Sequence, residues 1–261
     1  MRRNRRGRRA WRVLRALKRL PRAIQATVAV MALVVASFAV NWVYQVVRKP
    51  AELFFPVSGA LSKTPEETWR SYAAIFREHA TAVTTPEFLA ALAQIEGAGN
   101  PLARTYWRWR LTAEPFDVYR PASSAVGMYQ ITDGTFQQAK RYCIHDHVVV
   151  EEGTWYDPGS CWFNGLYLRV VPSNAVEMTS ALLDRTVARV LAEQSIGGAT
   201  LRQKQDLAAV IHLCGAATGA VYARRGFRVS AGQRCGSHDL GGYLTRLNAM
   251  KRVFFRLAKD S

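Results

Sequence analysis

Apolar residues run without a break through one stretch near the start of the chain, and later split into shorter helical patterns. Residues 23–47 contain no charged residue, and their centre is apolar on every face. A helix of this length rises about 37 Å, enough to cross a hydrocarbon core of about 30 Å. Trp42 and Tyr44 near its end, followed by Arg48, are typical of a membrane–water boundary. The pattern predicts one transmembrane helix over residues 23–47.

The basic residues set the expected orientation of this helix. Eleven of the 36 Lys and Arg residues lie within residues 1–22, which contain no acid. Because basic flanks stay on the cytoplasmic side, we expect a basic cytoplasmic tail over residues 1–22, an inner-membrane anchor and a periplasmic remainder. A cleaved signal peptide is the alternative, with residues 37–39 as the cleavage site, although the apolar run continues past them. Nucleic-acid binding by the tail is a weaker alternative, since basic clusters beside a span more often set topology or touch anionic lipid.

All four cysteines follow the predicted span. An even number in an oxidising compartment suggests two disulfides, for which three pairings exist. The pairing that we expect closes short loops: Cys143 with Cys161, and Cys214 with Cys235. A rival interpretation treats Cys143, His145 and His147 as metal ligands, but no second ligand pair accompanies them, and we predict neither a metal nor a cofactor.

Beyond residue 63 the pattern is mostly helical. Capping residues and prolines at first helical positions mark the helix starts. The predicted helices cover about residues 65–80, 86–97, 133–142, 174–195, 201 onward and 238–257. Residues 98–131 and 144–172 lack helical period and are rich in Trp, Tyr, Gly and Pro, so we expect long loops with room for short strands. The sequence predicts a mainly α domain over residues 64–261, joined to the anchor by a linker over residues 48–63.

The predicted helix over residues 86–97 ends in a single acid, Glu96. Its apolar stripe consists of Phe88, Leu89, Leu92 and Ile95. Glu96 lies on the edge of this stripe, where ionisation costs hydration and where the negative end of the helix dipole also opposes a negative charge. Both effects favour the protonated form that a general acid needs. A partly exposed glutamate without a role is the alternative.

A second stretch, SSAVGMYQIT at residues 123–132, changes this balance. Together with Glu96 and the following Asn100-Pro101, it resembles the lytic transglycosylases of the soluble-lytic-transglycosylase type, within the lysozyme-like superfamily. That family pairs a Glu-Ser-Gly-x-Asn-Pro-like motif with a later Gly-Ala-x-Gly-Leu-Met-Gln run. Residues 215–221 and 238–244 match two further family motifs weakly. The resemblance covers about residues 85–255 and implies a lysozyme-like fold.

The resemblance also implies a set of site residues. Glu96 takes the place of the catalytic acid, and Tyr243 would donate a hydrogen bond to it and orient it. The contacts to the glycan would come from Ser124, Gly127, Met128, Tyr129 and Gln130. Core packing is the alternative for Met128 and Tyr129, and a buried helix tyrosine is the alternative for Tyr243. The aromatic residues between 106 and 119 fit sugar stacking, core packing or a membrane interface equally well.

In that family one glutamate suffices for catalysis. It protonates the bond between N-acetylmuramic acid and N-acetylglucosamine, and then accepts a proton from the 6-hydroxyl of the muramic acid, which closes a 1,6-anhydro ring. This accounts for the lack of a clear second acid among the candidates Glu114, Asp117 and Asp133. The expected partners are peptidoglycan strands, the inner membrane and an envelope-spanning secretion or cell-envelope complex, and no nucleic acid.

Two positions depart from the family pattern. Gly97 stands where the family has a serine after the acid, and Gly215 stands where a later motif has an asparagine. These departures support a second interpretation, an inactive relative that binds glycan or acts as a scaffold in a secretion complex.

Overall fold

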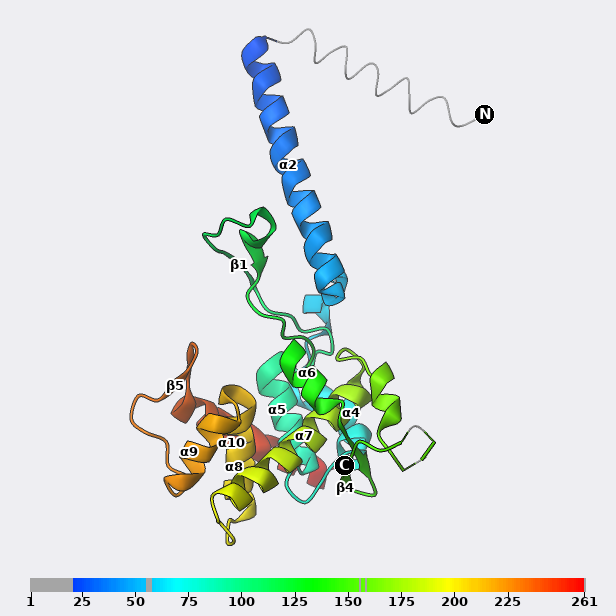
Figure 1. Cartoon of the computed structure of the whole chain (residues 1–261), viewed down its shortest axis with the longest axis vertical. Helices are drawn as coiled ribbons and strands as arrows, with labels where there is room; N and C mark the ends of the chain where they lie inside the picture. Colours follow the sequence, from blue (N-terminus) through cyan, green and yellow to red (C-terminus); the bar gives the residue numbers. More distant parts are fainter. Residues whose placement is uncertain (1–20, 55–57, 155, 158, 261) are drawn as a thin grey trace. The chain divides into compact units, whose positions relative to one another are not determined.

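Helices carry most of the described chain, so the expected mainly α class is confirmed. The computed structural model describes residues 21–54, 58–154, 156–157 and 159–260. Nearly all of the predicted basic tail therefore lies outside the described residues. The longer helices in Figure 1 are α2 (Arg22–Arg48), α4 (Pro65–Glu78), α5 (Pro86–Gly97), α6 (Asp133–Ala139), α7 (Pro172–Glu193), α8 (Leu201–Cys214), α9 (Ala216–Arg224) and α10 (Leu240–Lys259).

The chain divides into two compact units. Unit 1 takes residues 1–50 and 107–120, and unit 2 takes residues 51–106 and 121–261. The expected domain over residues 64–261 thus includes residues 107–120, which belong to unit 1 together with α2. This segment contains β1 (Trp107–Trp109), the 3₁₀ turn η3 (Pro115–Asp117) and β2 (Tyr119–Pro121), and β1 and β2 form a two-stranded sheet.

Helix α2 coincides with the predicted span and extends it by one residue at each end. It is long and apolar enough to cross a membrane, and its most apolar stretch buries none of its residues within the protein. Val30, Leu33 and Val35 are each more than half exposed. A helix of a soluble core would bury such side chains, whereas a lipid environment would cover them.

The core of unit 2 is built around α5. All six residues from Phe88 to Ala93 are fully buried, since α5 packs against α4 and α10 on different sides. A helix that is apolar on all faces belongs in an interior, and this one places its C-terminal end, with Glu96, inside the unit. Helix α7 packs against α4, α8 and α9 and completes the core.

The predicted helix starts are mostly confirmed at their caps. Thr64 with Glu67 forms a capping box on α4, and Thr200 with Gln203 forms one on α8. Helix α6 is shorter than predicted, because residues 142–145 form β3 (Tyr142–His145), which pairs antiparallel with β4 (Val148–Glu151). Helix α10 begins at Leu240, two residues later than predicted, and is capped by Asp239.

Helix α7 begins at Pro172, two residues before the predicted start, and the Glu177 side chain in its second turn is buried. Its carboxylate accepts a hydrogen bond from the Ile144 amide at 2.9 Å and one from the Tyr167 hydroxyl at 2.6 Å. Burial, together with this bonded carboxylate, raises the pKa of Tyr167 far above its usual value. Glu177 therefore fastens β3 and the segment around Tyr167 to α7.

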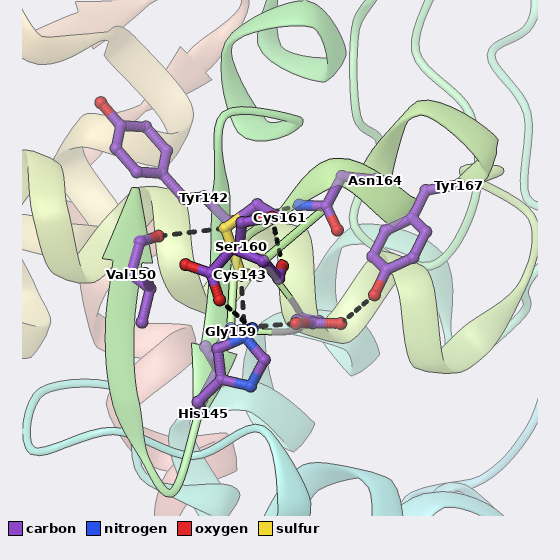
Figure 2. Close-up of a disulfide and its surroundings, with 12 residues drawn as sticks. Tyr142, Cys143, His145, Val150, Gly159, Ser160, Cys161, Asn164 and Tyr167 are labelled. Carbon is purple, nitrogen blue, oxygen red and sulfur yellow. Dashed lines mark hydrogen bonds between the residues drawn. A yellow bond between two sulfur atoms is a disulfide. The ribbon is translucent and has the colours of Figure 1, made fainter. Parts of the chain in front are cut away.

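Both predicted disulfides are present, Cys143–Cys161 and Cys214–Cys235. Figure 2 shows the first, where Cys161 lies just before η4 (Trp162–Leu166) and joins that turn to β3. His145 places its Nε2 3.4 Å from the Cys143 sulfur. Since Cys143 is bonded to Cys161, it cannot serve as the thiolate ligand that the metal interpretation needs.

The segment expected to be a linker packs against unit 2. It contains η1 (Pro50–Phe54) and η2 (Gly59–Leu61). Glu52 is fully buried and pairs with Arg104 at 2.9 Å. The Asn100 side-chain amide donates to the Ser58 carbonyl at 2.5 Å. The linker prediction is therefore wrong for residues 51–54 and 58–61, which contact the loop that follows α5 through Glu52 and Ser58.

Candidate active site

The end of α5 is closed by its own backbone, which fixes the position of Glu96 in the last turn. Ala98 adopts a left-handed conformation with φ of 50°, and the Gly99 amide donates to the Ala93 carbonyl at 3.1 Å. The side chain of Glu96 is only 15% exposed. Glu96 is therefore a largely enclosed acid at a helix terminus.

Gly97 brings this helix end into direct contact with the segment that carries the second motif. A Cβ atom at Gly97 would lie 2.8 Å from the Met128 Cα and 2.9 Å from its carbonyl oxygen. Such a contact would force the backbone of residues 127–130 away from α5. The departure from the family serine at this position thus has a packing reason.

The hydrogen bond expected between Tyr243 and Glu96 is present. The Tyr243 hydroxyl, on the first turn of α10, donates to Glu96 Oε1 at 2.5 Å. Burial, the nearby negative charge of Glu96 and this hydrogen bond all raise the pKa of Tyr243 well above its ordinary value. Tyr243 is therefore a protonated donor across the neutral range, and it holds one oxygen of Glu96 in place.

His212 also faces Glu96, although it was not among the predicted site residues. It lies on the last turn of α8, and its Nε2 is 4.0 Å from Glu96 Oε1. The His212 side chain is 10% exposed. A protonated imidazole at this distance stabilises the Glu96 carboxylate, and a neutral one needs only a small movement to form a hydrogen bond. Its place three residues before the motif-like run at Gly215 was the available signal.

A cavity of about 150 Å³ adjoins this group, between α6, α7 and α8. Gln130, His212 and Gly215 are among the residues that line it. Thr179 lines it too, and its hydroxyl oxygen is buried without a hydrogen-bond partner within the described part of the chain. An orphaned buried hydroxyl favours a bound polar group, since leaving it unpaired costs about 1–3 kcal/mol. His212 connects the cavity to Glu96.

Gly215 ends α8 and begins α9 with φ of +83°. This region of backbone conformation favours glycine, and nothing lies within 4 Å of the position that a Cβ would take. An asparagine, which the family has here, would be strained in this backbone. Gly215 therefore permits the sharp turn between α8 and α9, and its lack of a side chain leaves open space beside the cavity.

Most of the residues expected to touch glycan have structural roles instead. Met128 and Tyr129 are fully buried, and the Tyr129 hydroxyl donates to the Leu89 carbonyl at 3.1 Å, so their side chains belong to the core. The missing side chain of Gly127 makes room for a protein backbone oxygen, that of Arg169, which would lie 2.5 Å from a Cβ. The lining role expected for Met128 and Tyr129 and the glycan approach expected at Gly127 are therefore corrected.

Ser124 and Gln130 differ from these three. The Ser124 hydroxyl accepts a hydrogen bond from the amide of Asp133 at 3.1 Å, near the start of α6. Gln130 lines the cavity, and its side-chain amide donates to the Gly127 carbonyl at 2.9 Å. Asp133, considered as a second catalytic acid, pairs with Arg169 at 2.8 Å. Among the expected glycan contacts, Gln130 has the geometry that the prediction needs.

Comparisons of the chain with protein-family models, with curated proteins and with solved structures found no match. The chemistry of the site therefore has to be read from its residues. An enclosed carboxyl group, held by a phenol and faced by an imidazole that lines a cavity, can both donate and accept a proton.

Proposed function

We propose that the chain is a membrane-anchored peptidoglycan lytic transglycosylase in which Glu96 acts first as an acid and then as a base. The observation that carries the proposal is the enclosed Glu96 carboxyl, bonded to Tyr243 and adjoining a cavity through His212. The sequence resemblance to lytic transglycosylases at Glu96, Asn100-Pro101 and residues 124–130 supplies the reaction class.

The reaction needs one group that carries a proton in each direction. Protonated Glu96 donates to the oxygen that joins N-acetylmuramic acid to N-acetylglucosamine, and the bond from C1 of the muramic acid to that oxygen breaks. The 6-hydroxyl oxygen of the same muramic acid then bonds to C1, and its proton passes to the Glu96 carboxylate. The products are an N-acetylglucosamine end and a 1,6-anhydro-muramic acid, and Glu96 is protonated again. Water is not consumed.

Tyr243 and His212 suit this sequence of steps. Tyr243 holds Glu96 Oε1, which leaves the other carboxyl oxygen for the proton transfer. His212 lies on the cavity side of the acid, where a positive charge would stabilise the carboxylate that forms after the first step. Gln130 and Thr179 provide polar groups for the amide or hydroxyl substituents of a sugar.

The proposed location follows from α2 and the disulfides. An N-terminal helix long and apolar enough for a membrane, preceded by a basic tail, fits an inner-membrane anchor with a cytoplasmic N-terminus. Two disulfides fit a periplasmic domain, because that compartment is oxidising.

The second candidate is an inactive relative that binds glycan or acts as a scaffold in a secretion complex. The observation that favours it is Gly215, which offers no side chain where the family has an asparagine. Binding to peptidoglycan without turnover is the outcome that this candidate predicts.

The test incubates the full chain with purified sacculi and identifies the soluble products by mass spectrometry. Anhydro-muropeptides from the wild type, absent with Glu96→Gln, are the expected result. Glu87→Gln is the matched control, because Glu87 is a partly exposed acid in the first turn of the same helix α5. It should keep the wild-type rate.

Two other outcomes contradict the proposal. Products that end in a reducing muramic acid would mean hydrolysis and a water nucleophile. Sacculus binding by the wild type without any soluble product would support the inactive relative instead.

A further inference from the structure

The hairpin of residues 107–120, in unit 1, exposes large apolar side chains next to α2. Leu111 is fully exposed and Trp109 is 65% exposed, and Arg108 and Arg110 alternate with them along the chain. We propose that this hairpin enters the lipid bilayer and places Trp109 and Leu111 in contact with acyl chains. The inference rests on the proposed membrane span of α2 and concerns the leaflet at the C-terminal end of that helix.

Two side-chain amides of α2 fasten the hairpin to the helix. Asn41 donates to the Tyr119 carbonyl at 2.8 Å, and Gln45 donates to the Phe116 carbonyl at 2.6 Å. Amides on a lipid-facing helix are costly when they lack partners, and so are backbone carbonyls near the acyl chains. Each of the two hydrogen bonds satisfies one side-chain N–H donor of α2 and one backbone carbonyl of the hairpin. The hairpin therefore packs on this face of α2.

Aromatic contacts extend the same interface. Phe38 meets the rings of Trp109 and Tyr119 edge-on, with centroids 6.1 and 6.2 Å away, and Tyr44 stacks on Phe116 at 4.8 Å. Trp109 also packs against Tyr119 at 4.6 Å and still remains 65% exposed. A small groove of about 160 Å³ remains between Phe38, Trp109 and neighbouring residues. Its walls suit part of an acyl chain.

The helix gives the depth of the hairpin in a bilayer. The middle of the uncharged stretch, residues 23–47, is residue 35. Along the helix axis Phe38 lies about 5 Å and Gln45 about 15 Å beyond that middle, and half of a hydrocarbon core is also about 15 Å. Trp109, which contacts Phe38, therefore falls among the acyl chains, whereas Phe116, which is bonded to Gln45, falls near the headgroup boundary. Tyr44, which stacks on Phe116, lies at the same boundary, a region that Tyr side chains favour.

The charges of the hairpin fit phosphate headgroups. Asp117 is paired with Arg48 of α2 at 3.5 Å and with Arg120 at 2.9 Å, so its negative charge is compensated. Arg108 and Arg110 are exposed beside the apolar side chains, as in segments that dip into an anionic lipid surface. Charge and apolar exposure together favour lipid over a sugar strand for this surface.

A spin label tests the inference in the full chain, reconstituted into vesicles of phosphatidylethanolamine and phosphatidylglycerol. The sequence has four cysteines and all are in disulfides, so Leu111→Cys offers one labelling site. Val148→Cys is the control, a 64% exposed apolar residue in β4 of unit 2. The Leu111 label should be more accessible to oxygen than to a water-soluble nickel complex, and the Val148 label should show the reverse.

Each other result for Leu111 overturns the inference. A label as accessible to the nickel complex as that at Val148 places the hairpin in water, where it could meet a sugar strand. A label shielded from both reagents places it under protein.

Tryptophan quenching gives a second measurement that needs only a conservative change. Lipids with brominated acyl chains should quench less fluorescence in Trp109→Phe than in the wild type, and Trp42→Phe, on α2, is the positive control. No change with Trp109→Phe alone overturns the hairpin inference and leaves the anchor intact. Unchanged quenching in both variants would contradict the proposed membrane span of α2 as well. The catalytic proposal is tested separately by the sacculus assay.

Discussion

Tyr243 and Glu96 lie 147 residues apart in the chain, and the Tyr243 hydroxyl donates a 2.5 Å hydrogen bond to Glu96 Oε1. The contact depends on the packing of α10 against α5, which brings the first turn of one helix to the last turn of the other. It holds the same carboxyl oxygen that lies 4.0 Å from His212 Nε2.

Removing the Tyr243 hydroxyl should impair catalysis more than folding. A hydrogen bond to a charged group contributes about 1.5–3 kcal/mol, so we expect Tyr243→Phe to lower the rate of anhydro-muropeptide release by roughly 10- to 100-fold. Mass spectrometry of sacculus digests measures that rate. Tyr222→Phe, in the buried tyrosine of α9, is the control and should keep the rate. Equal losses in the two variants would mean that the effect is structural.

The raised pKa of Tyr243 gives a prediction for alkaline pH. The folded state holds the phenol proton more tightly than the unfolded state, whose tyrosines titrate near pH 10. The resulting stability is fully present below about pH 10 and is lost as the pH rises through the folded-state pKa. Thermal midpoints between pH 8 and 11.5 should therefore fall less steeply above pH 10 for Tyr243→Phe than for the wild type. Parallel curves would contradict the buried donor.

The elements that local signals determine were predicted well. Residues 64–67 and 200–203 capped their helices as expected, because a capping box satisfies backbone donors within four residues. The uncharged run of α2 and the short-loop disulfides are equally local features. Glu96 at the end of α5 was singled out from its apolar stripe and its position together with the family resemblance at residues 123–132.

The remainder depends on long-range packing that no local pattern encodes. The sequence pattern fits Met128 and Tyr129 equally well as residues that line a glycan groove and as core residues. Only their packing against α5 shows that their side chains belong to the core. His212 lies on a helix whose period does not reveal which face meets Glu96. The hairpin of residues 107–120 joined α2 through two amides, Asn41 and Gln45, that look unremarkable in the sequence.

Gly97 should tolerate no larger residue. A Cβ there meets the Met128 backbone at 2.8 Å, so Gly97→Ser should lower the free energy of unfolding by about 1–3 kcal/mol, although serine is the family residue. Gly134→Ala is the matched control, because Gly134 is in α6 with nothing within 4 Å of its Cβ position. That change should be neutral or stabilising by about 0.5–1 kcal/mol, as expected for Gly to Ala within a helix. Denaturant unfolding distinguishes the two.

A neutral result for Gly97→Ser would mean that α5 and the Met128 segment are further apart than described. The Gly97→Ser substitution should also affect activity, because a displaced Met128 segment would move Gln130, which lines the cavity. We therefore expect the serine variant to release product more slowly at temperatures where it is folded.

Loss of either disulfide should lower stability, but only loss of Cys214–Cys235 should also lower turnover of the folded protein. Cys214–Cys235 joins the end of α8, two residues after His212, to β5 (Arg234–Cys235), which precedes the helix of Tyr243. The double change Cys214→Ala and Cys235→Ala releases a loop with a sequence separation of 21 residues, and it should cost roughly 3 kcal/mol of stability. It should also lower turnover of the remaining folded protein, because the segments that carry His212 and Tyr243 are no longer tied together.

Replacing Cys143 and Cys161 by alanine is the matched control, with a similar separation of 18 residues and a place beside β3 and η4. By the same loop-entropy reasoning its stability cost should be similar, but the turnover of the folded protein should stay at the wild-type rate. Thermal unfolding and product release, both measured well below the unfolding temperature of each variant, separate the two effects. Equal loss of turnover in both variants would show that the Cys214–Cys235 link stabilises the domain as a whole and has no particular role in aligning His212 and Tyr243 around Glu96.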